Sequence, residues 1–218
     1  MKRSIFISRQ LSENSELLSF LRKEKWEIHH HSLIRIERIN FKIESKFDWL
    51  FISSSNGAKI LFAAFSPSDD VKIAAVGEAT ANAIRGFGFD VNFVGDSGDM
   101  DQVGNAFFKT LGNQKVLFAG AESGSKKVRN CLPSDQVSFT PIYRTIQKIE
   151  IELPKTDVVF LTSPSNAKAY FEAISECAQQ FIAIGNTTAE YLNSCGIKDV
   201  LIPKTPQEEE VITLLKGL

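Results

Sequence analysis

Neutral hydrogen-bonding side chains gather at four places in the sequence, each where an apolar run typical of a strand changes at once into a helical pattern. The start of a helix presents unpaired backbone N–H groups and the positive end of its dipole, and both attract carboxylates and phosphates. The chemistry that these residues could do is therefore the binding of an anion by hydrogen bonds. The residues are Ser54, Ser55, Asn56, Thr80, Ser163, Ser165, Asn166, Thr187 and Thr188.

A structural interpretation stays open beside this one. Ser, Thr and Asn are preferred at the first positions of helices, so each of these side chains could simply cap its own helix. Because the junctions occur in duplicate, the pattern as a whole favours binding. Neither glycine-rich nucleotide motif, G-x-G-x-x-G or G-x-x-x-x-G-K-[ST], occurs in the chain, so the sequence does not point to a nucleotide ligand.

The duplication extends over much of the chain. The stretch "DWLFISSSNGAKILF" at residues 48–62 is matched by "DVVFLTSPSNAKAYF" at residues 157–171. The stretch "AAVGEATANAIRGFGF" at 74–89 is matched by "IAIGNTTAEYLNSCGI" at 182–197, at almost the same offset. Chance rarely preserves two motifs together with their separation, so the sequence predicts two lobes of similar fold.

Strand and helix patterns alternate through both copies. The predicted strands are continuous apolar runs, as expected for parallel strands that are buried on both faces, and helical patterns follow them. This alternation predicts an α/β fold with parallel sheets, whose carboxyl ends carry ligand sites, so the four junctions could line one cleft. The predicted strands are 4–8, 48–53, 72–77, 115–120, 157–162 and 181–185, with further helices over 15–23 and 125–132.

Two segments do not follow the β-α alternation. Residues 32–39 and 142–151 alternate apolar and polar side chains in stretches, which is typical of antiparallel strands with one exposed face. We therefore expect them to form a two-stranded connector between the lobes.

Composition excludes several classes of protein. The hydrophobic fraction of 43% and charged fraction of 23% are ordinary for a globular protein, and a net charge of −1 without a basic stripe argues against nucleic-acid binding. The apolar run after Arg3 is too short for a secretion signal or a membrane span, so we expect a cytoplasmic protein without membrane partners. The three cysteines, Cys131, Cys177 and Cys195, lack the spacing of a disulfide framework or zinc site.

A metal site is not expected at the run of three histidines, residues 29–31. Adjacent side chains on a strand point to opposite faces and cannot easily converge on one ion.

An ordered set of motifs resembles the uroporphyrinogen-III synthase family over essentially the whole chain. The motifs are "ISSSNGAK", "AVGEATANAIRGFGF", "PIYRT", "FLTSPSNAKAYF", "AIGNTTAEYL" and "IPKTPQEEEVITLL". The resemblance implies two similar parallel-sheet α/β lobes joined by a two-stranded antiparallel β-ladder. It implies that residues 1–31 and 153–218 form one lobe, residues 40–140 the other, and residues 32–39 and 141–152 the ladder.

The resemblance also implies an activity. Members of the family cyclise linear hydroxymethylbilane to uroporphyrinogen III, with loss of water and inversion of the last pyrrole ring. The implied enzyme is a lyase of tetrapyrrole biosynthesis that uses no metal and no organic cofactor. It is expected to be a monomer that receives its substrate from hydroxymethylbilane synthase. The substrate's acetate and propionate arms would explain the anion-binding helix starts.

Individual residues match the family pattern. Tyr143 matches a tyrosine proposed to assist departure of the hydroxyl, and a phenol can donate the hydrogen bond needed. Thr80, Ser54, Ser163 and Thr188 would bind substrate carboxylates. A structural role in the ladder stays open for Tyr143, as capping does for the others.

Arg9 matches a frequent family arginine and would bind a propionate. An exposed, solvated side chain is the other interpretation of Arg9.

A second function of a different class stays open. A non-enzymatic protein with two lobes that closes on a small polyanionic ligand would need the same anion-binding junctions. Tyr143 and the complete ordered set of motifs favour the enzyme.

Overall fold

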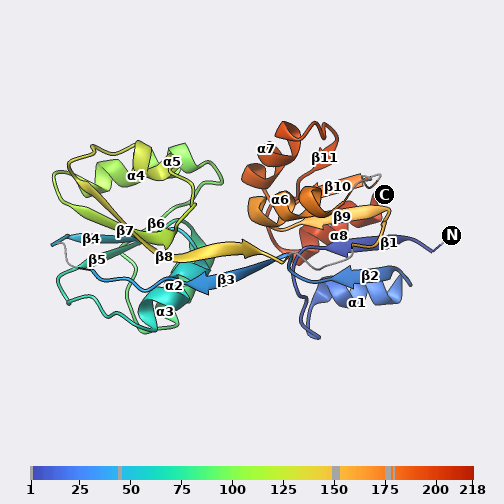
Figure 1. Ribbon diagram of the computed structural model, residues 1–218, viewed down its shortest axis with the longest axis horizontal. Helices are drawn as coiled ribbons and strands as arrows, with labels where there is room; N and C mark the ends of the chain where they lie inside the picture. Colours follow the sequence, from blue (N-terminus) through green and yellow to red (C-terminus); the bar gives the residue numbers. More distant parts are fainter. Residues whose placement is uncertain (1, 44–45, 149–152, 175–177, 179) are drawn as a thin grey trace. The chain divides into compact units, whose positions relative to one another are not determined.

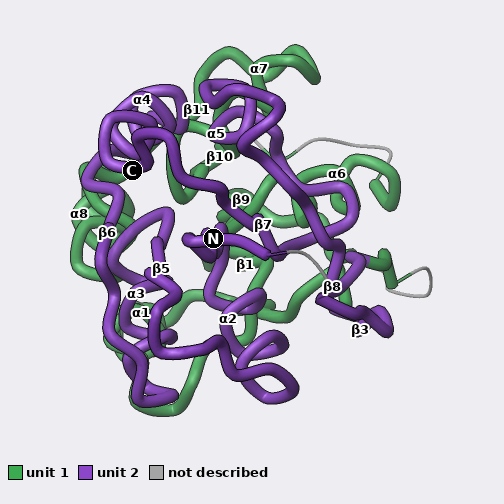
Figure 2. Tube along the Cα trace, turned by 90° about the vertical axis from the view of Figure 1, so that its left-hand side faces the viewer, with its two compact units in different colours: residues 1–35, 146–218 green, residues 36–145 purple. Residues whose placement is uncertain are grey.

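The structure is a computed structural model that describes residues 2–43, 46–148, 153–174, 178 and 180–218. Four predictions fall partly outside the described residues: residues 1, 175–177 and 179 of lobe 1, residues 44–45 of lobe 2, residues 149–152 of the connector, and Cys177. The chain divides into two compact units, coloured separately in Figure 2. Unit 1 comprises residues 1–35 and 146–218, and unit 2 comprises residues 36–145.

Unit 2 carries the larger sheet, with strand order β3-β8-β7-β4-β5-β6. Two helices cover each face of this sheet, α2 and α3 on one side and α4 and α5 on the other (Figure 1). The strands are β3 (Ile34–Arg38), β4 (Trp49–Ile52), β5 (Lys72–Ala75), β6 (Phe93–Val94), β7 (Val116–Ala121) and β8 (Val137–Gln147). The helices are α2 (Ser55–Phe62), α3 (Glu78–Arg85), α4 (Met100–Leu111) and α5 (Lys127–Asn130).

Unit 1 holds a five-stranded sheet of order β11-β10-β9-β1-β2, in which every pairing is parallel. Helices α1 and α8 pack on one face, and α6 and α7 on the other. The strands are β1 (Ser4–Ile7), β2 (Glu27–His30), β9 (Val158–Leu161), β10 (Gln180–Ala183) and β11 (Val200–Leu201). The helices are α1 (Glu16–Lys23), α6 (Pro164–Ala173), α7 (Asn186–Ser194) and α8 (Glu208–Lys216).

The two sheets share one strand order, although the chain enters them at different points. In unit 2 the order in space is β6-β5-β4-β7-β8, and in unit 1 it is β11-β10-β9-β1-β2. The chain of unit 2 runs through its strands without interruption, whereas unit 1 takes its last two positions from β1 and β2. Arg3 Nη2 donates to the carbonyl oxygen of Leu218 at 2.9 Å, so residues far apart in sequence meet within unit 1. Unit 1 is therefore a circularly permuted version of unit 2.

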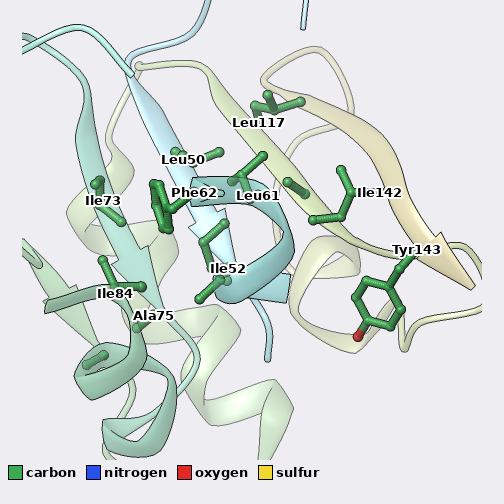
Figure 3. Packing of buried hydrophobic residues seen from close by; sticks show 13 residues of the cluster. Leu50, Ile52, Leu61, Phe62, Ile73, Ala75, Ile84, Leu117, Ile142 and Tyr143 are labelled. Carbon is green, nitrogen blue, oxygen red and sulfur yellow. The ribbon is translucent and has the colours of Figure 1, made fainter. Parts of the chain in front are cut away.

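The central strands explain why both sheets form. All residues of β4 and of β9 are buried, as the continuous apolar runs predict for strands with helices on both faces. Each sheet consequently has two cores, and Figure 3 shows the one beneath α2 and α3, from Leu50 to the margin at Tyr143. The predicted α/β fold class with two similar parallel sheets is confirmed.

Strands β3 and β8 pair in antiparallel fashion. Ile39 N donates to Ile142 O at 3.0 Å and Lys148 N to Leu33 O at 2.9 Å, so residue numbers rise along β3 as they fall along β8. The structure adds a feature that the alternating pattern did not indicate, since β8 begins at Val137 and its first half pairs parallel with β7. The assignment of residues 32–39 and 141–152 to a separate connector stays a prediction.

Two local differences from the sequence analysis have simple causes. The helix predicted over 125–132 covers only Lys127–Asn130, because Cys131 N and Leu132 N donate to carbonyls three residues back and the chain continues as turns. Strand β2 was not predicted, because an edge strand with Ile28 as its one aliphatic residue has no apolar run.

A residue with strained backbone follows helix α1. Lys25 has φ of 58°, and the hydrogen bond from Trp26 N to Leu21 O closes the turn that this conformation allows. At the three other described positions with positive φ the chain has glycine, namely Gly88, Gly112 and Gly196.

We expect Lys25→Gly to raise the free energy of unfolding by about 1 kcal/mol, because glycine adopts this conformation without a Cβ clash. Urea unfolding followed by circular dichroism would measure the change. The control is Lys23→Gly at the last residue of α1, where glycine has no conformational advantage and should lower the free energy of unfolding. A Lys25→Gly variant no more stable than the parent would contradict the explanation.

Candidate functional site

The candidate site in each unit lies at the point where the strand order reverses. Loops on either side of such a point diverge at the carboxyl ends of the strands and leave room for a ligand. This point lies between β4 and β7 in unit 2 and between β9 and β1 in unit 1. The junctions that start α2 and α6 follow β4 and β9 directly, and those that start α3 and α7 follow the neighbouring strands.

In unit 2, Ser54 and Tyr143 form a hydrogen-bonded pair at this point. Ser54 is the N-cap of α2, and its Oγ accepts a hydrogen bond from Gly57 N at 2.9 Å. The same Oγ lies 2.9 Å from the phenolic oxygen of Tyr143, and either hydroxyl can donate. Tyr143 is 6% exposed, so its phenol is nearly buried beside the first turn of α2.

A β-bulge places Tyr143 there. Gly120 pairs with Pro141 and Ala121 pairs with Tyr143, so Ile142 is an extra residue in β8. Ile142 and Tyr143 consequently both belong to the core beneath α2 and α3, although neighbours on a regular strand face opposite sides (Figure 3). The carbonyl of Tyr143 accepts from Glu122 N at 2.8 Å, which anchors the bulge to the end of β7.

In unit 1 the corresponding cap is used differently. Ser163 Oγ accepts from the backbone N of Asn166 at 3.1 Å and from its Nδ2 at 3.0 Å. Asn166 Oδ1 in turn accepts from Leu33 N at 2.8 Å. Both polar side chains are therefore engaged within the protein, where they hold the chain just after β2.

The strand ends of unit 1 are also joined by a pair that the sequence analysis missed. Ser8 is fully buried, and its Oγ accepts from Thr162 N at 2.8 Å while Thr162 Oγ1 donates to Ser8 O at 3.2 Å. In unit 2 the ends of β7 and β4 come equally close, since a Cβ added to Gly120 would lie 3.1 Å from Ser53 Oγ. The signal in the sequence was a hydroxyl residue ending each apolar run.

The other two junctions lack side-chain caps. Gly77 and Gly185 are the N-caps of α3 and α7, so no side chain satisfies the N–H groups that begin these helices. Thr80 and Thr188 occupy the third position of each helix and are buried, and within the described chain their hydroxyls have no hydrogen-bond partner. That these duplicated threonines bind an anion stays a prediction, because 4% of Thr80 and 2% of Thr188 is exposed.

The remaining neutral residues differ in availability. Asn56, Ser165 and Thr187 are exposed in the first turns of their helices. The Ser55 hydroxyl donates to Ala79 O at 3.0 Å and so ties α2 to α3.

Arg9 is held by an acidic residue. Its Nη2 lies 2.8 Å from Glu208 Oε1, while Glu208 Oε2 accepts from Ser15 Oγ at 2.7 Å and Leu17 N at 3.0 Å. The Nε of Arg9 is buried without a hydrogen-bond partner in the described chain. One carboxylate thus connects the starts of α1 and α8 with the predicted cationic residue of the site. No local pattern in the sequence indicated this contact.

Two kinds of feature are absent from the described residues. Among them no three His, Cys, Asp or Glu side chains are grouped to hold a metal ion. None of their helices combines the length and apolar character needed to span a membrane.

The three adjacent histidines make separate contacts. His29 Nε2 lies 3.1 Å from Glu27 Oε1, His30 Nδ1 accepts from Leu11 N, and His31 packs edge-on against Phe6.

The comparisons with known proteins agree with this architecture. The model of the family described as uroporphyrinogen-III synthase HemD matches residues 15–213. The chain belongs to this family. Among curated proteins, no match to the chain was found.

Solved structures from two organisms share the fold. A uroporphyrinogen-III synthetase from Helicobacter pylori superposes with a TM-score of 0.73 at 20% identity, covering 100% of this chain and 99% of that one. A mutant uroporphyrinogen III synthase from the extremely thermophilic bacterium Thermus thermophilus gives a TM-score of 0.67 at 14% identity, covering 99% and 98%. At these identities the likeness concerns the fold.

Burial makes His31 a pH-sensitive element of unit 1. Burial, followed by the charges of Lys148, His29 and His30, lowers the pKa of His31 below its ordinary value. Its Nε2 is buried and has no hydrogen-bond partner in the described chain.

We expect the stabilising effect of a neutral His31 to be lost on acidification. Below about pH 6.5 the unfolded chain gains a proton at this position while the folded chain resists it, so the free energy of unfolding falls. His31→Gln removes this contribution. Urea unfolding should therefore show a smaller difference between parent and variant at pH 5.5 than at pH 7.5, and an equal difference at both would refute the assignment.

Proposed function

We propose that this protein is a uroporphyrinogen-III synthase, a cyclising hydro-lyase. It would convert hydroxymethylbilane to uroporphyrinogen III, releasing water and inverting the last pyrrole ring. Membership of the family over residues 15–213 supports the activity. The observation that carries the chemistry is the hydrogen bond between Tyr143 and Ser54 at the start of α2.

Carboxylate recognition follows from the junctions. The substrate's acetate and propionate arms would bind the first N–H groups of α3 and α7, together with the hydroxyls of Thr80 and Thr188. The exposed residues Asn56, Ser165 and Thr187 would add hydrogen bonds at the rims. Such binding needs no basic surface, in agreement with a net charge of −1.

The α7 junction is better suited to a carboxylate than the α3 junction. Helix α3 begins with Glu78, whose charge opposes an anionic arm even though it pairs with Arg85. Helix α7 begins with Asn186, which is neutral. We therefore assign the tighter carboxylate contact to Thr188 and its helix.

The main catalytic task is orientation. The linear substrate also cyclises unaided, to the isomer without inversion, so the protein must favour attack through the substituted carbon of the last ring. Holding two reacting groups in the required geometry can contribute roughly 7–11 kcal/mol. Binding of several arms at once is what would supply that restraint.

Tyr143 would assist the departure of the hydroxyl through a relay. Ser54 Oγ already accepts from Gly57 N and can donate its own proton to the Tyr143 oxygen. The phenolic O–H is then free to donate to the leaving hydroxyl. The positive end of the α2 dipole polarises the relay in the required direction. Ser54 thereby acts by orienting Tyr143 as well as by capping its helix.

Arg9 would bind a propionate at a cost. Its guanidinium is paired with Glu208, so a substrate carboxylate must share it or use the donors that the pair leaves unoccupied.

The proposed reaction needs no metal and no organic cofactor. The proposal further places the enzyme in the cytoplasm as a monomer supplied by hydroxymethylbilane synthase.

The direct test is the isomer ratio of the product. Freshly prepared hydroxymethylbilane is incubated with the protein, and the porphyrins obtained by oxidation are separated. We expect the type III isomer in excess over the isomer that forms spontaneously. A spontaneous ratio together with saturable binding of the linear compound would favour the non-enzymatic binding protein, and a spontaneous ratio without binding would refute both functions.

Replacing Tyr143 by Phe should lower single-turnover cyclisation by roughly 10- to 100-fold, because one hydrogen-bond donor to the leaving group is lost. Ser54→Ala should cause a smaller loss in the same step, since the phenol remains but its orientation does not. The control is Tyr191→Phe, which removes a phenol on α7 outside this pair. Single-turnover rates unaffected by Tyr143→Phe would leave the tyrosine with a packing role.

A further inference from the structure

An arginine in unit 2 lies against an aromatic ring without an acidic partner. Arg129 belongs to α5, and its Cζ lies 3.9 Å from the centre of the Phe139 ring. Among the described residues, no hydrogen-bond acceptor or carboxylate engages its guanidinium. A guanidinium presents five N–H donors in a planar fork, so this one is oriented by the ring with its donors unused.

The arginine lines a pocket that has two basic side chains and no acidic side chain in its lining. The pocket combines basic, polar neutral and apolar side chains. Besides Arg129 and Phe139, its lining residues are Lys126, Asn130, Leu132, Ser134 and Val137. Asp135 is adjacent to Ser134 in sequence but is not part of the lining. A hollow with two positive charges and no negative one attracts an anion.

Partial burial makes the unpaired positive charge of Arg129 energetically unfavourable. Arg129 is half-buried, and this burial lowers the pKa of its guanidinium. A partly buried charge is stabilised when a counter-charge supplies hydrogen bonds. A carboxylate or phosphate can do so with two parallel N–H···O bonds to one guanidinium.

This pocket is distinct from the Tyr143 site. Val137 and Phe139 contribute to the core on the α4 and α5 face of the sheet, whereas Tyr143 contributes to the core beneath α2 and α3. Val137 pairs with Val116, the first residue of β7, and so lies toward the amino end of the strand. Figure 1 shows α5 on the opposite side of the sheet from α2.

The geometry points to a second binding site in unit 2, for a small amphipathic anion. Arg129 and Lys126 bind its carboxylate or phosphate oxygens, and Asn130 and Ser134 add hydrogen bonds. Leu132 and Val137 contact an apolar group attached to the anion. The four-residue helix α5 contributes the side chains of Arg129 and Asn130 and not an N-terminal dipole.

The test uses the full-length protein and four probes: benzoate, phenyl phosphate, inorganic phosphate and phenol. Two-dimensional ¹H–¹⁵N NMR follows the amides of Asn130 and Ser134 during titration. Saturable shifts are expected with benzoate and phenyl phosphate, and affinities at least about fivefold weaker for inorganic phosphate and phenol, which each lack one half of the ligand. Whichever of benzoate and phenyl phosphate binds more tightly shows whether the anionic group of the ligand is a carboxylate or a phosphate.

Variants separate recognition from general electrostatics. Arg129→Lys keeps the charge but loses the planar fork, so we expect affinity for the better probe to fall about tenfold. The matched control is Arg38→Lys, since Arg38 also lies near a ring, 5.7 Å from the centre of Phe41, but outside the pocket. Phe139→Leu, which removes the ring beneath the guanidinium, should weaken binding as well.

Absence of saturable shifts would overturn the site. Equal affinity of the parent and Arg129→Lys would overturn the role of the arginine, and equal affinity for inorganic phosphate and phenyl phosphate would overturn the amphipathic ligand. Unchanged dispersion of the remaining amide signals shows that each variant is folded. The product isomer ratio should be the same for Arg129→Lys and the parent, so the outcome is independent of the proposed cyclisation.

Discussion

The structure depends on the burial of two four-residue strands, β4 and β9, on both of their faces. A strand buried in this way carries only apolar side chains, so polar groups can appear only where it ends. Because every neighbour in each five-stranded arrangement runs parallel to it, those ends meet at one edge. The concentration of hydroxyls and free N–H groups there is a consequence of core formation, and in the proposed function these groups bind the substrate.

The two units share one strand order but differ in the hydrogen bonds that their polar side chains make at that edge. In unit 1 the polar side chains beside β9 and β1 form structural hydrogen bonds, since Ser8, Thr162, Ser163 and Asn166 bind one another or nearby backbone. In unit 2 the cap of α2 instead contacts a phenol. The glycine-capped helices α3 and α7 are alike in both units. The symmetric positions suit recognition of a substrate with repeated arms, and the asymmetric one suits a single chemical event.

The sequence predicted the features that hydrophobic runs and the internal repeat can encode. Continuous apolar runs located β1, β4, β5, β7, β9 and β10, and the repeat predicted two similar sheets. The position of Tyr143 depends on a bulge at Ile142 and on β8 exchanging β7 for β3 as its neighbour, and neither leaves a mark on a two-residue period. The pairing of Arg9 with Glu208 joins residues almost a whole chain apart, a contact that no local pattern encodes. Whether the predicted residues bind substrate stays a prediction.

The split of unit 1 between two distant parts of the sequence has a consequence for the order of folding. Unit 2 is one continuous segment of chain and can close its sheet while the ribosome is still adding the residues that follow. The first strand of unit 1 must wait, because its neighbour β9 and the helix α8 that covers it are made only after unit 2. During synthesis the apolar side chains of β1 and α1 therefore remain without their final cover until α8 has emerged, and transiently exposed apolar surface of this kind is prone to aggregation.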